Sequence, residues 1–346
     1  MPLKSLNTFH PPRARKERVG EIVFVLLVDR TNKLTHRGSL TSPPRRLNNA
    51  AVTENPVWTI RRILEWTTGY FKKKNVFQPR LSTEQLLAHV LNFPRIKLYT
   101  EYERPLDDKE LVAFRALVVR AVEDEPIAYL TGKAPFFSLE FVVTRDVLIP
   151  RPDTETLVEH VLQFFRHQPG MEAPRVLDLC TGSGCIAASI AHHCKRASVL
   201  ATEISPPAAE VARRNIERLK LTERVTIHEG DLFDPLTRLA DALPFDVIVS
   251  NPPYIPSGDL AALDRSVKDF EPHLALDGGP DGLALHRRIL KISPDRMVPG
   301  GRIFLEIQFD QGERMMSLIA EHPAFDEARL LKDGGGRDRV LTARRK

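Results

Sequence analysis

Mostly apolar residues recur at spacings of three and four in three stretches between residues 56 and 121, which is the spacing of one face of an α-helix. The recurring positions are Ile60, Ile63, Leu64 and Thr67; Thr83, Leu86, Leu87, Val90 and Leu91; and Leu111, Phe114, Leu117, Val118 and Ala121. Ser82 precedes Glu84 and Gln85 and is a candidate helix N-cap. These patterns predict a small all-α domain over residues 55–133.

Two stretches rich in aromatic and β-branched residues follow the helical pattern. They cover residues 136–143 and 146–149 and predict a β-hairpin. Pro150-Arg151-Pro152 comes next, and its two prolines make a stiff connector because each fixes its own φ. We therefore expect a hairpin linker over residues 134–152.

Beyond residue 152 the pattern alternates between short apolar runs and stretches of helical period. The runs predict strands at 175–179, 198–202, 225–228, 245–250 and 302–307, with two more near 328–332 and 338–343. Helices are predicted at 154–166, 185–195, 283–290 and 310–320, and another begins at Ser205-Pro206. Strands separated by helices predict an α/β domain over residues 153–346, with a mostly parallel sheet covered on both faces.

The charge of the chain is concentrated at one end. The whole sequence carries +5, but residues 1–54 contain ten Lys or Arg and four acidic residues, so the other 292 residues carry about −1. A nearly neutral body gives little support for a nucleic-acid-binding face. Residues 1–54 lack a sustained apolar period, and we expect a basic, mostly disordered extension there.

The three cysteines, Cys180, Cys185 and Cys194, form no CxxC pair and have no His partner at zinc-ligand spacing. We therefore expect no metal site, and the sparse, odd count favours the reducing cytoplasm. The apolar run at 22–28 is too short to span a bilayer, so no membrane partner is expected.

The first strand of the alternating region, 175–179, runs into a glycine turn that opens a helix. The turn consists of Cys180, Thr181, Gly182, Ser183 and Gly184. Ligands of such sheets bind beyond the carboxyl ends of the strands, and a glycine lets the backbone approach a ligand without a Cβ in the way. The spacing matches neither GxGxxG nor a P-loop, which disfavours a dinucleotide or a nucleoside triphosphate.

Acidic residues lie at or after three successive strands. Glu203 ends the second strand, where its two oxygens can accept both hydroxyls of a ribose. Asp231 follows the third strand and is placed to accept from an adenine amino group, with Leu232 packing on the ring. Asp178 has two open interpretations, since it can hold the glycine turn or contact the amino group of the ligand. Together these positions predict an adenosine-type ligand.

The strand at 245–250 ends in Asn251-Pro252-Pro253-Tyr254. Its prolines have no N–H, and a residue before proline is held extended, so the corner is rigid and rich in acceptors. Asn251 Oδ1 and the Pro252 carbonyl can accept the two hydrogens of an incoming NH₂ group, while Tyr254 offers a flat face for packing. This arrangement fits methyl transfer from S-adenosylmethionine to an amide or an exocyclic amine, driven by positioning and polarisation.

The glycine turn and the Asn251 corner together resemble the amino-methyltransferases of the class I Rossmann-like fold. Four further stretches, 125–132, 148–155, 270–276 and 336–340, resemble the release-factor glutamine methyltransferases. The resemblance covers residues 56–344. It implies a seven-stranded sheet with an antiparallel last strand, preceded by a helical substrate-recognition domain.

The resemblance also implies the ligands. S-adenosylmethionine would be the cofactor and S-adenosylhomocysteine its product, with contacts from Asp178, from 180–184, and from Glu203, Asp231, Leu232 and Asn251. The substrate would be the N5 amide of the glutamine in the GGQ motif of a class I peptide-chain release factor. It would contact Arg151 and the residues of the corner, Asn251, Pro252, Pro253 and Tyr254. A monomer with no direct nucleic-acid substrate is expected.

Three residues depart from the family pattern. Members usually have Gly at the position of Cys180 and often an aromatic residue at that of Leu232, and Gln308 stands where Gly is expected. We interpret the first two as altered packing around the cofactor. The basic extension is not a family feature.

Rival functions share the Asn251 corner. A DNA adenine-N6 methyltransferase would flip its base into the same corner, but it needs a basic face or a long insertion after Tyr254. A glutamine methyltransferase acting on a ribosomal protein is a nearer rival, and the stretch 152–155 favours release factors. A non-catalytic adenosine-binding regulator would not need an intact Asn251.

Overall fold

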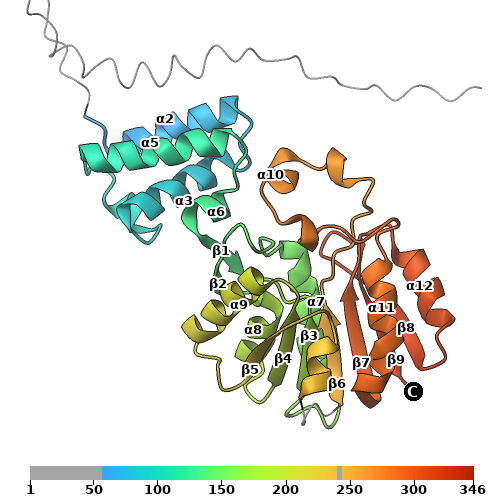
Figure 1. Ribbon diagram of the computed structural model, residues 1–346. Helices are drawn as coiled ribbons and strands as arrows, with labels where there is room; N and C mark the ends of the chain where they lie inside the picture. The colour runs from blue at the N-terminus through green and yellow to red at the C-terminus, as the bar shows by residue number, and fades with distance from the viewer. Residues whose placement is uncertain (1–56, 240–243) are drawn as a thin grey trace, which may run out of the picture. The chain divides into compact units, whose positions relative to one another are not determined.

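The computed structural model describes residues 57–239 and 244–346 (Figure 1). Thr59–Lys346 forms one compact unit, which contains the elements described below. The predicted extension over residues 1–54 lies outside the described residues. None of the helices in the described part is both long and apolar enough to cross a membrane.

The predicted helical region is present. Its helices are α2 (Ile60–Lys73), α3 (Pro79–Leu91), α4 (Lys97–Thr100), α5 (Asp108–Val122) and α6 (Ile127–Thr131). Most of the predicted apolar positions are buried, while Val90, Leu111 and Leu117 are half-buried. Helix α5 starts with a reciprocal cap, because Glu110 N–H donates to the Asp107 side chain at 2.8 Å and Asp107 N–H donates to the Glu110 carboxylate at 2.9 Å.

Helix α3 begins three residues before its predicted cap. Pro79 occupies the first helical position, which proline favours, and Gln78 precedes it in a left-handed conformation. Ser82 is buried inside the helix, and its hydroxyl donates to the Phe77 carbonyl at 2.7 Å. The prediction of Ser82 as the N-cap is therefore wrong.

The predicted β-hairpin is present, but its strands lie earlier than expected. Strands β1 (Lys133–Phe136) and β2 (Leu139–Val142) pair antiparallel, and the second predicted strand, 146–149, is irregular. The turn residues Phe137 and Ser138 have φ of 45° and 64°. Two positive φ values are typical of a type I′ turn, which favours Asn and Gly, so Phe-Ser carried no turn signal and the predicted strand ran through it.

A seven-stranded sheet forms the centre of the remaining chain and confirms the α/β prediction. Its strands are β3 (Arg175–Leu179), β4 (Ser198–Glu203), β5 (Val225–Glu229), β6 (Phe245–Ser250), β7 (Met297–Glu306), β8 (Phe325–Lys332) and β9 (Asp338–Arg345). They follow the order β5-β4-β3-β6-β7-β9-β8. The first four pairs are parallel, and β9 pairs antiparallel with both β7 and β8. The last strand is antiparallel, as predicted.

Helices cover both faces of this sheet (Figure 1). They are α7 (Pro152–His167), α8 (Cys185–His193), α9 (Pro206–Arg218), α11 (Ala284–Ile292) and α12 (Gly312–Ala320). The connecting segments contain the short α10 (Arg265–Lys268) and the 3-10 turns η1 (Asp234–Arg238), η2 (Leu260–Ala262), η3 (His273–Ala275) and η4 (Ser293–Arg296). Successive strand residues enter opposite cores. Val176 and Val247 pack with residues of α7 and α8, whereas Leu177 and Ile248 pack with residues of α11 and α12.

Strand β3 lies where the order of the sheet reverses. Strands β4 and β5 continue on one side of it and β6 lies on the other. In open parallel sheets, ligands bind in the crevice beyond the carboxyl ends of the strands at such a reversal. Apart from Arg151, which precedes α7, the predicted site residues lie at the ends of β3, β4, β5 and β6 or directly after them, so the topology gathers them at this edge.

One buried side chain attaches the hairpin to the sheet domain. Val142 N–H donates to Asn215 Oδ1 at 2.7 Å, and Asn215 Nδ2 donates to the carbonyls of Val142 and Ser183, each at 2.9 Å. Asn215 belongs to α9 and is fully buried. The Asn215 carboxamide therefore pairs both backbone polar groups of Val142 at the edge of β2 and one carbonyl of the glycine turn.

We expect Asn215→Ala to lower the free energy of unfolding by roughly 2–4 kcal/mol, because buried polar groups left unpaired cost about 1–3 kcal/mol each. Urea denaturation measures this change. Glu217→Ala, on the exposed face of the same helix, is the control and should change stability by less than about 0.5 kcal/mol. Equal stability of the two variants would contradict the assigned role.

Candidate functional site

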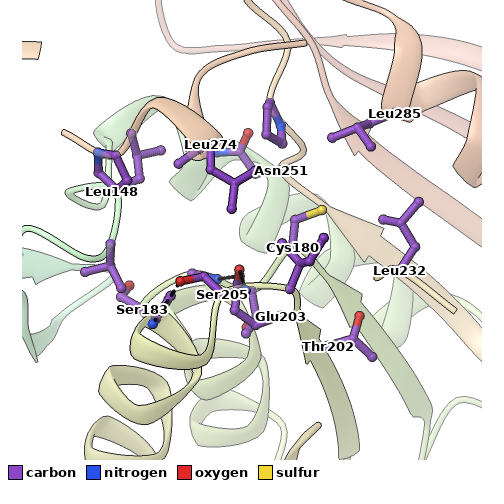
Figure 2. A pocket seen from close by; sticks show the side chains of 18 of the residues that line it. Leu148, Cys180, Ser183, Thr202, Glu203, Ser205, Leu232, Asn251, Leu274 and Leu285 are labelled. Atoms are coloured by element: carbon purple, nitrogen blue, oxygen red, sulfur yellow. Dashed lines mark hydrogen bonds between the residues drawn. The ribbon is translucent and has the colours of Figure 1, made fainter. Parts of the chain in front are cut away.

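The carboxyl edge of the sheet opens into a cavity of 420 Å³ (Figure 2). This volume is within the usual range for small-molecule sites, roughly 300–1,000 Å³. The predicted site residues that line it are Cys180, Thr181, Gly182, Ser183, Glu203, Asp231, Leu232, Asn251 and Pro253. Asp178, Gly184, Pro252, Tyr254 and Arg151 are not among the described residues that line it.

The two glycines of the turn have different surroundings. Gly182 has φ of +56°, and a Cβ added to it would have no neighbouring atom within 4 Å. Gly184 has φ of +78°, and a Cβ there would lie 3.3 Å from Ala212 Cβ. Gly184 therefore allows α8 to begin close against α9. The sequence assigned both glycines to ligand approach, and the structure brings only Gly182 to the cavity.

Glu203 joins two loops at the cavity. Gly182 N–H donates to its Oε2 at 2.9 Å, and Ser205 N–H donates to its Oε1 at 3.0 Å. Burial raises the pKa of Glu203, and these backbone N–H groups oppose that shift. Each carboxylate oxygen has a second lone pair, so both can still accept a hydroxyl from a ligand.

Asp178 is fully buried behind the glycine turn. Thr181 Oγ1 donates to Asp178 Oδ2 at 2.6 Å, and burial raises the pKa of Asp178 to about 7. Of the two interpretations left open by the sequence, this contact matches the one in which Asp178 holds the turn. The bond joins Asp178 to the side chain of a turn residue.

Two non-glycine residues at the cavity have left-handed backbone. Cys180 has φ of 58° and Leu232 has φ of 47°. This conformation costs about 1–2 kcal/mol for a residue with a Cβ, and such strain is concentrated at functional sites. Both are positions where the resemblance led us to expect a different residue. The glycine expected at 180 would adopt this conformation without strain.

Asp231 forms an ion pair with an arginine that was not predicted as a site residue. Arg288 Nη2 lies 2.7 Å from Asp231 Oδ2, and Arg288 itself lines the cavity from α11. Leu148, Leu274 and Leu285 add apolar walls that were also missed (Figure 2). A signal existed for Leu148 and Leu274, because both lie in stretches that carry the family resemblance.

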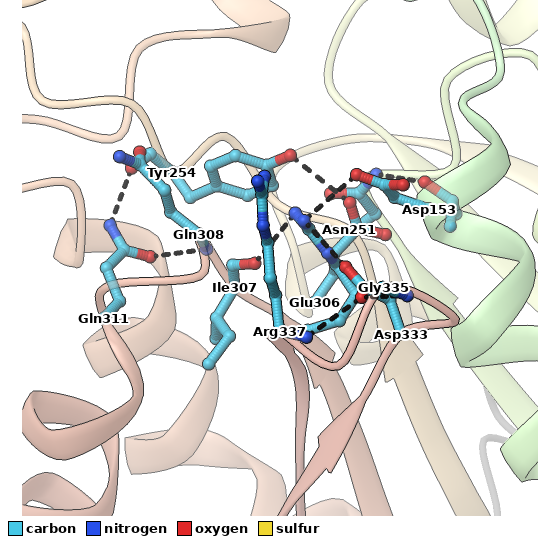
Figure 3. Close-up of polar contacts among 12 residues, drawn as sticks. Asp153, Asn251, Tyr254, Glu306, Ile307, Gln308, Gln311, Asp333, Gly335 and Arg337 are labelled. Carbon is cyan, nitrogen blue, oxygen red and sulfur yellow. Dashed lines mark hydrogen bonds and ion pairs between the residues drawn. The ribbon is translucent and has the colours of Figure 1, made fainter.

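Two side chains of the Asn251 corner form hydrogen bonds with residues that do not line the cavity. Asn251 Nδ2 donates one of its two hydrogens to Thr154 Oγ1 at 3.1 Å, and Oδ1 is an acceptor that a ligand can use. Tyr254 is half-buried, and its hydroxyl donates to Glu306 Oε1 at 3.3 Å (Figure 3). Thr154 and Glu306 were not predicted as site residues.

The backbone after the prolines is clamped by close packing. Gln311 Nε2 donates to the Tyr254 carbonyl at 2.8 Å, and Gln308 N–H donates to Gln311 Oε1 at 3.0 Å (Figure 3). A Cβ added to Gly278 would lie 2.7 Å from Tyr254 Cα, and Gly278 N–H donates to the Ile255 carbonyl at 2.8 Å. The corner thus regains backbone partners once the prolines end.

Arg151 joins two of the resemblance stretches. Its Nη2 forms an ion pair with Glu271 Oε1, and Ile149 N–H donates to Glu271 Oε2 at 3.2 Å. Burial raises the pKa of Glu271, and Arg151 opposes that shift. The predicted contact of Arg151 with a substrate stays a prediction.

We expect Cys180→Gly to unfold with a free energy roughly 0.5–1 kcal/mol higher than Cys180→Ala. Both variants lose the thiol, but alanine keeps the Cβ strain of about 1–2 kcal/mol, which outweighs the extra backbone entropy of glycine, about 0.5–1 kcal/mol. Urea denaturation of the two proteins measures the difference. A less stable glycine variant would show that position 180 is not strained.

Family models match two parts of the chain. The model described as PrmC N-terminal domain matches residues 62–132, and the model described as Methyltransferase small domain matches residues 153–280. The first match covers the helical region. The second runs from α7 to just beyond Gly278 and includes the glycine turn, Glu203, Asp231 and the Asn251 corner.

Similar proteins are found over most of the chain. A release factor glutamine methyltransferase of Geobacter sulfurreducens is 44% identical, covering 85% of this chain and 99% of that protein. One of Rhodopirellula baltica is 40% identical, covering 85% of this chain and 98% of that protein. The crystal structure of a release factor-specific protein-(glutamine-N5) methyltransferase from Alicyclobacillus acidocaldarius is 34% identical, covers 60% of this chain and 99% of that one, and has a TM-score of 0.35. The chain belongs to the family of release factor glutamine methyltransferases.

Proposed function

We propose that this chain transfers a methyl group from S-adenosylmethionine to the N5 amide of the glutamine in the GGQ motif of a class I peptide-chain release factor. The observation that carries the proposal is the Asn251 corner at the cavity. There the carboxamide nitrogen donates one hydrogen to Thr154, and Oδ1 can accept from an incoming amide. Family membership supplies the class of substrate.

The cavity fits S-adenosylmethionine, which supplies an electrophilic methyl group when bound. Glu203 presents two acceptor oxygens suited to ribose hydroxyls, and the open space at Gly182 admits a ligand close to the backbone. Asp231, fixed by Arg288, and Leu232 are suited to the base. Among the described residues, no three His, Cys, Asp or Glu side chains are placed to hold a metal ion.

The corner acts on the substrate by positioning. An amide nitrogen is a weak nucleophile because its lone pair is delocalised into the carbonyl. In this proposal Asn251 Oδ1, which lines the cavity, accepts one of its hydrogens, and the carbonyl of the adjacent Pro252 is the expected acceptor for the other. Both acceptors would polarise the N–H bonds and fix the direction of the nitrogen. Alignment of this kind can supply roughly 7–11 kcal/mol of the barrier.

The helical region is suited to recognising the protein that carries the glutamine. One glutamine on a loop offers few contacts, so selectivity needs a second surface. Large apolar side chains are exposed in this region, including Phe77 (81% exposed), Ile96 (71%) and Val112 (64%). The division into domains at 55–133, 134–152 and 153–346 stays a prediction, as do a monomeric state and a cytoplasmic location.

The activity is tested by incubating a GGQ-bearing release factor with the enzyme and a methyl-labelled cofactor, followed by peptide mass spectrometry. One labelled methyl on the GGQ glutamine supports the proposal, and a release factor with GGA in that motif is the control. Label on a ribosomal protein or on DNA adenine, without label on the release factor, would instead favour a rival function.

Asn251→Ala should reduce kcat at least ~100-fold, because the transition state loses an oriented acceptor. The affinity for S-adenosylmethionine, measured by calorimetry, should change by less than about threefold, which is under 1 kcal/mol. If cofactor binding is lost together with activity, Asn251 serves the cofactor and not the amide.

Glu203→Gln should weaken binding of S-adenosylmethionine by roughly 10- to 100-fold. The NH₂ group of the new glutamine would face one of the two backbone N–H groups that donate to the Glu203 carboxylate, so one hydrogen bond would be lost. Hydrogen bonds to a charged group contribute about 1.5–3 kcal/mol each. The matched control is Glu229→Gln, at the end of the next strand, where the side chain is exposed and pairs with Arg213 at 2.8 Å. Equal affinities for the two variants would contradict this role.

A further inference from the structure

One face of helix α11 lines the cavity beside Leu232. This face consists of Ala284, Leu285 and Arg288, whose spacing places them on one side of a helix. Leu285 packs against the apolar cluster that contains Leu232 (Figure 2). The helix therefore brings an apolar side chain and, one turn later, a guanidinium group to the same part of the cavity.

Among the described residues, Arg288 is the only Lys or Arg that lines the cavity. Its Nη2 lies 2.7 Å from Asp231 Oδ2, and the two side chains are 49% and 34% exposed. Ion pairs this exposed contribute little to stability, so the fold gains little from this one. Both partners line the cavity beside Leu232, where the base of the cofactor is expected.

The ion pair leaves hydrogen-bonding groups of both partners for a ligand. A carboxylate has two oxygens, and the pair engages Asp231 Oδ2, so Oδ1 can still accept. A guanidinium group has five N–H donors in a planar fork, and the bond to Asp231 uses one of them. The pair therefore places an acceptor next to a donor at the apolar wall formed by Leu232 and Leu285.

We propose that Arg288 reads the adenine ring of the cofactor directly, by donating to a ring nitrogen beside the amino group that Asp231 accepts. The inference rests on the proposed function, because it takes the ligand of the cavity to be an adenosine compound. Adenine carries a donor on N6 and an acceptor on either side of it, N1 and N7, which complements an acceptor next to a donor. Hypoxanthine has an oxygen at position 6 and a hydrogen on N1, which is the reverse order. Arg288 and Asp231 together therefore determine the specificity for the base.

Two simpler roles of Arg288 make different predictions. If Arg288 only orients Asp231, its removal weakens all adenosine ligands by the same factor, whichever ring nitrogen they contain. If Arg288 binds the carboxylate of the amino-acid part of the cofactor, its removal leaves ligands without that carboxylate unaffected. Analogues of the cofactor product separate these roles from base reading.

Arg288→Met removes the donors and keeps an apolar stem of similar length. Calorimetry should show that it binds S-adenosylhomocysteine roughly 10-fold more weakly than the unaltered protein, because a hydrogen bond from a charged group is lost. The matched control is Arg287→Met. Arg287 is the preceding residue of α11, has a side chain that is 47% exposed and pairs with Asp281 outside the cavity lining. The control should change the affinity by less than about twofold, and equal affinities of the two variants would overturn the proposal.

The 1-deaza and 7-deaza analogues of S-adenosylhomocysteine each replace one ring nitrogen by C–H. The unaltered protein should bind one of them roughly 10-fold more weakly than S-adenosylhomocysteine. Arg288→Met should bind that analogue and S-adenosylhomocysteine within about twofold of each other, because the side chain and the ring nitrogen form a single contact. If both analogues have the same relative affinity in the variant as in the unaltered protein, Arg288 does not touch the ring and the proposal is wrong.

5′-Methylthioadenosine lacks the amino-acid part of the cofactor and tests the carboxylate role. Its affinity, measured by competition with S-adenosylhomocysteine, should also fall roughly 10-fold in Arg288→Met. An unchanged affinity would assign Arg288 to the carboxylate and overturn the proposal.

These measurements need no methyl acceptor, so they separate this inference from the proposed function. If Arg288 couples to a ring nitrogen but the release factor is not methylated, the inference stands and the proposed substrate is wrong. Methylation of the release factor without that coupling would refute the inference alone.

Discussion

The parallel alignment of β3, β4, β5 and β6 is the constraint on which the site depends. Parallel strands place all their carboxyl ends at one edge, and the reversal of order at β3 separates the loops there into two groups. The loops after β3 and β4 are tied together by Glu203, which accepts from backbone N–H groups of both. The corner after β6 lies on the other side. The cavity lies between these two groups of loops. The loops after β3 and β4 form the half proposed to bind the methyl donor, and the corner after β6 belongs to the half proposed to bind the methyl acceptor.

The centre of the sheet was predictable because strands such as β3 and β6 are buried on both faces. Such strands are continuous apolar runs, and the bounds of β3 and β6 agree with the prediction to the residue. The hairpin was less predictable, since distant contacts fix its turn. Phe137 N–H donates to Glu155 Oε1 at 2.8 Å, and the Phe137 ring meets the His193 ring edge-on with centroids 5.0 Å apart. These contacts hold a backbone conformation that local preference would not select.

The residues of the site show the same distinction between what a local pattern predicts and what distant contacts decide. The sequence located the residues at the strand ends, because their positions follow from the topology. It did not give their orientations or their partners, since these depend on contacts across long stretches of chain. Arg288 is 57 residues from Asp231, and Thr154 is 97 residues from Asn251. No local pattern marks a positive φ at Cys180 or Leu232 either, although the glycine that the resemblance led us to expect at position 180 is consistent with it.

The buried acids near the cavity bear on how an amide can be methylated without a strong base. Asp178 and Glu306 both have a pKa raised to about 7 by burial, which would suit general-base catalysis near neutral pH. A base must also reach the proton that it removes, and neither carboxyl lines the cavity. Each is instead bonded to a hydroxyl, Asp178 to Thr181 and Glu306 to Tyr254, in a residue that shapes one half of the site. These acids hold the two halves in place, and under the proposed function the activation of the substrate nitrogen falls to the acceptors of the corner.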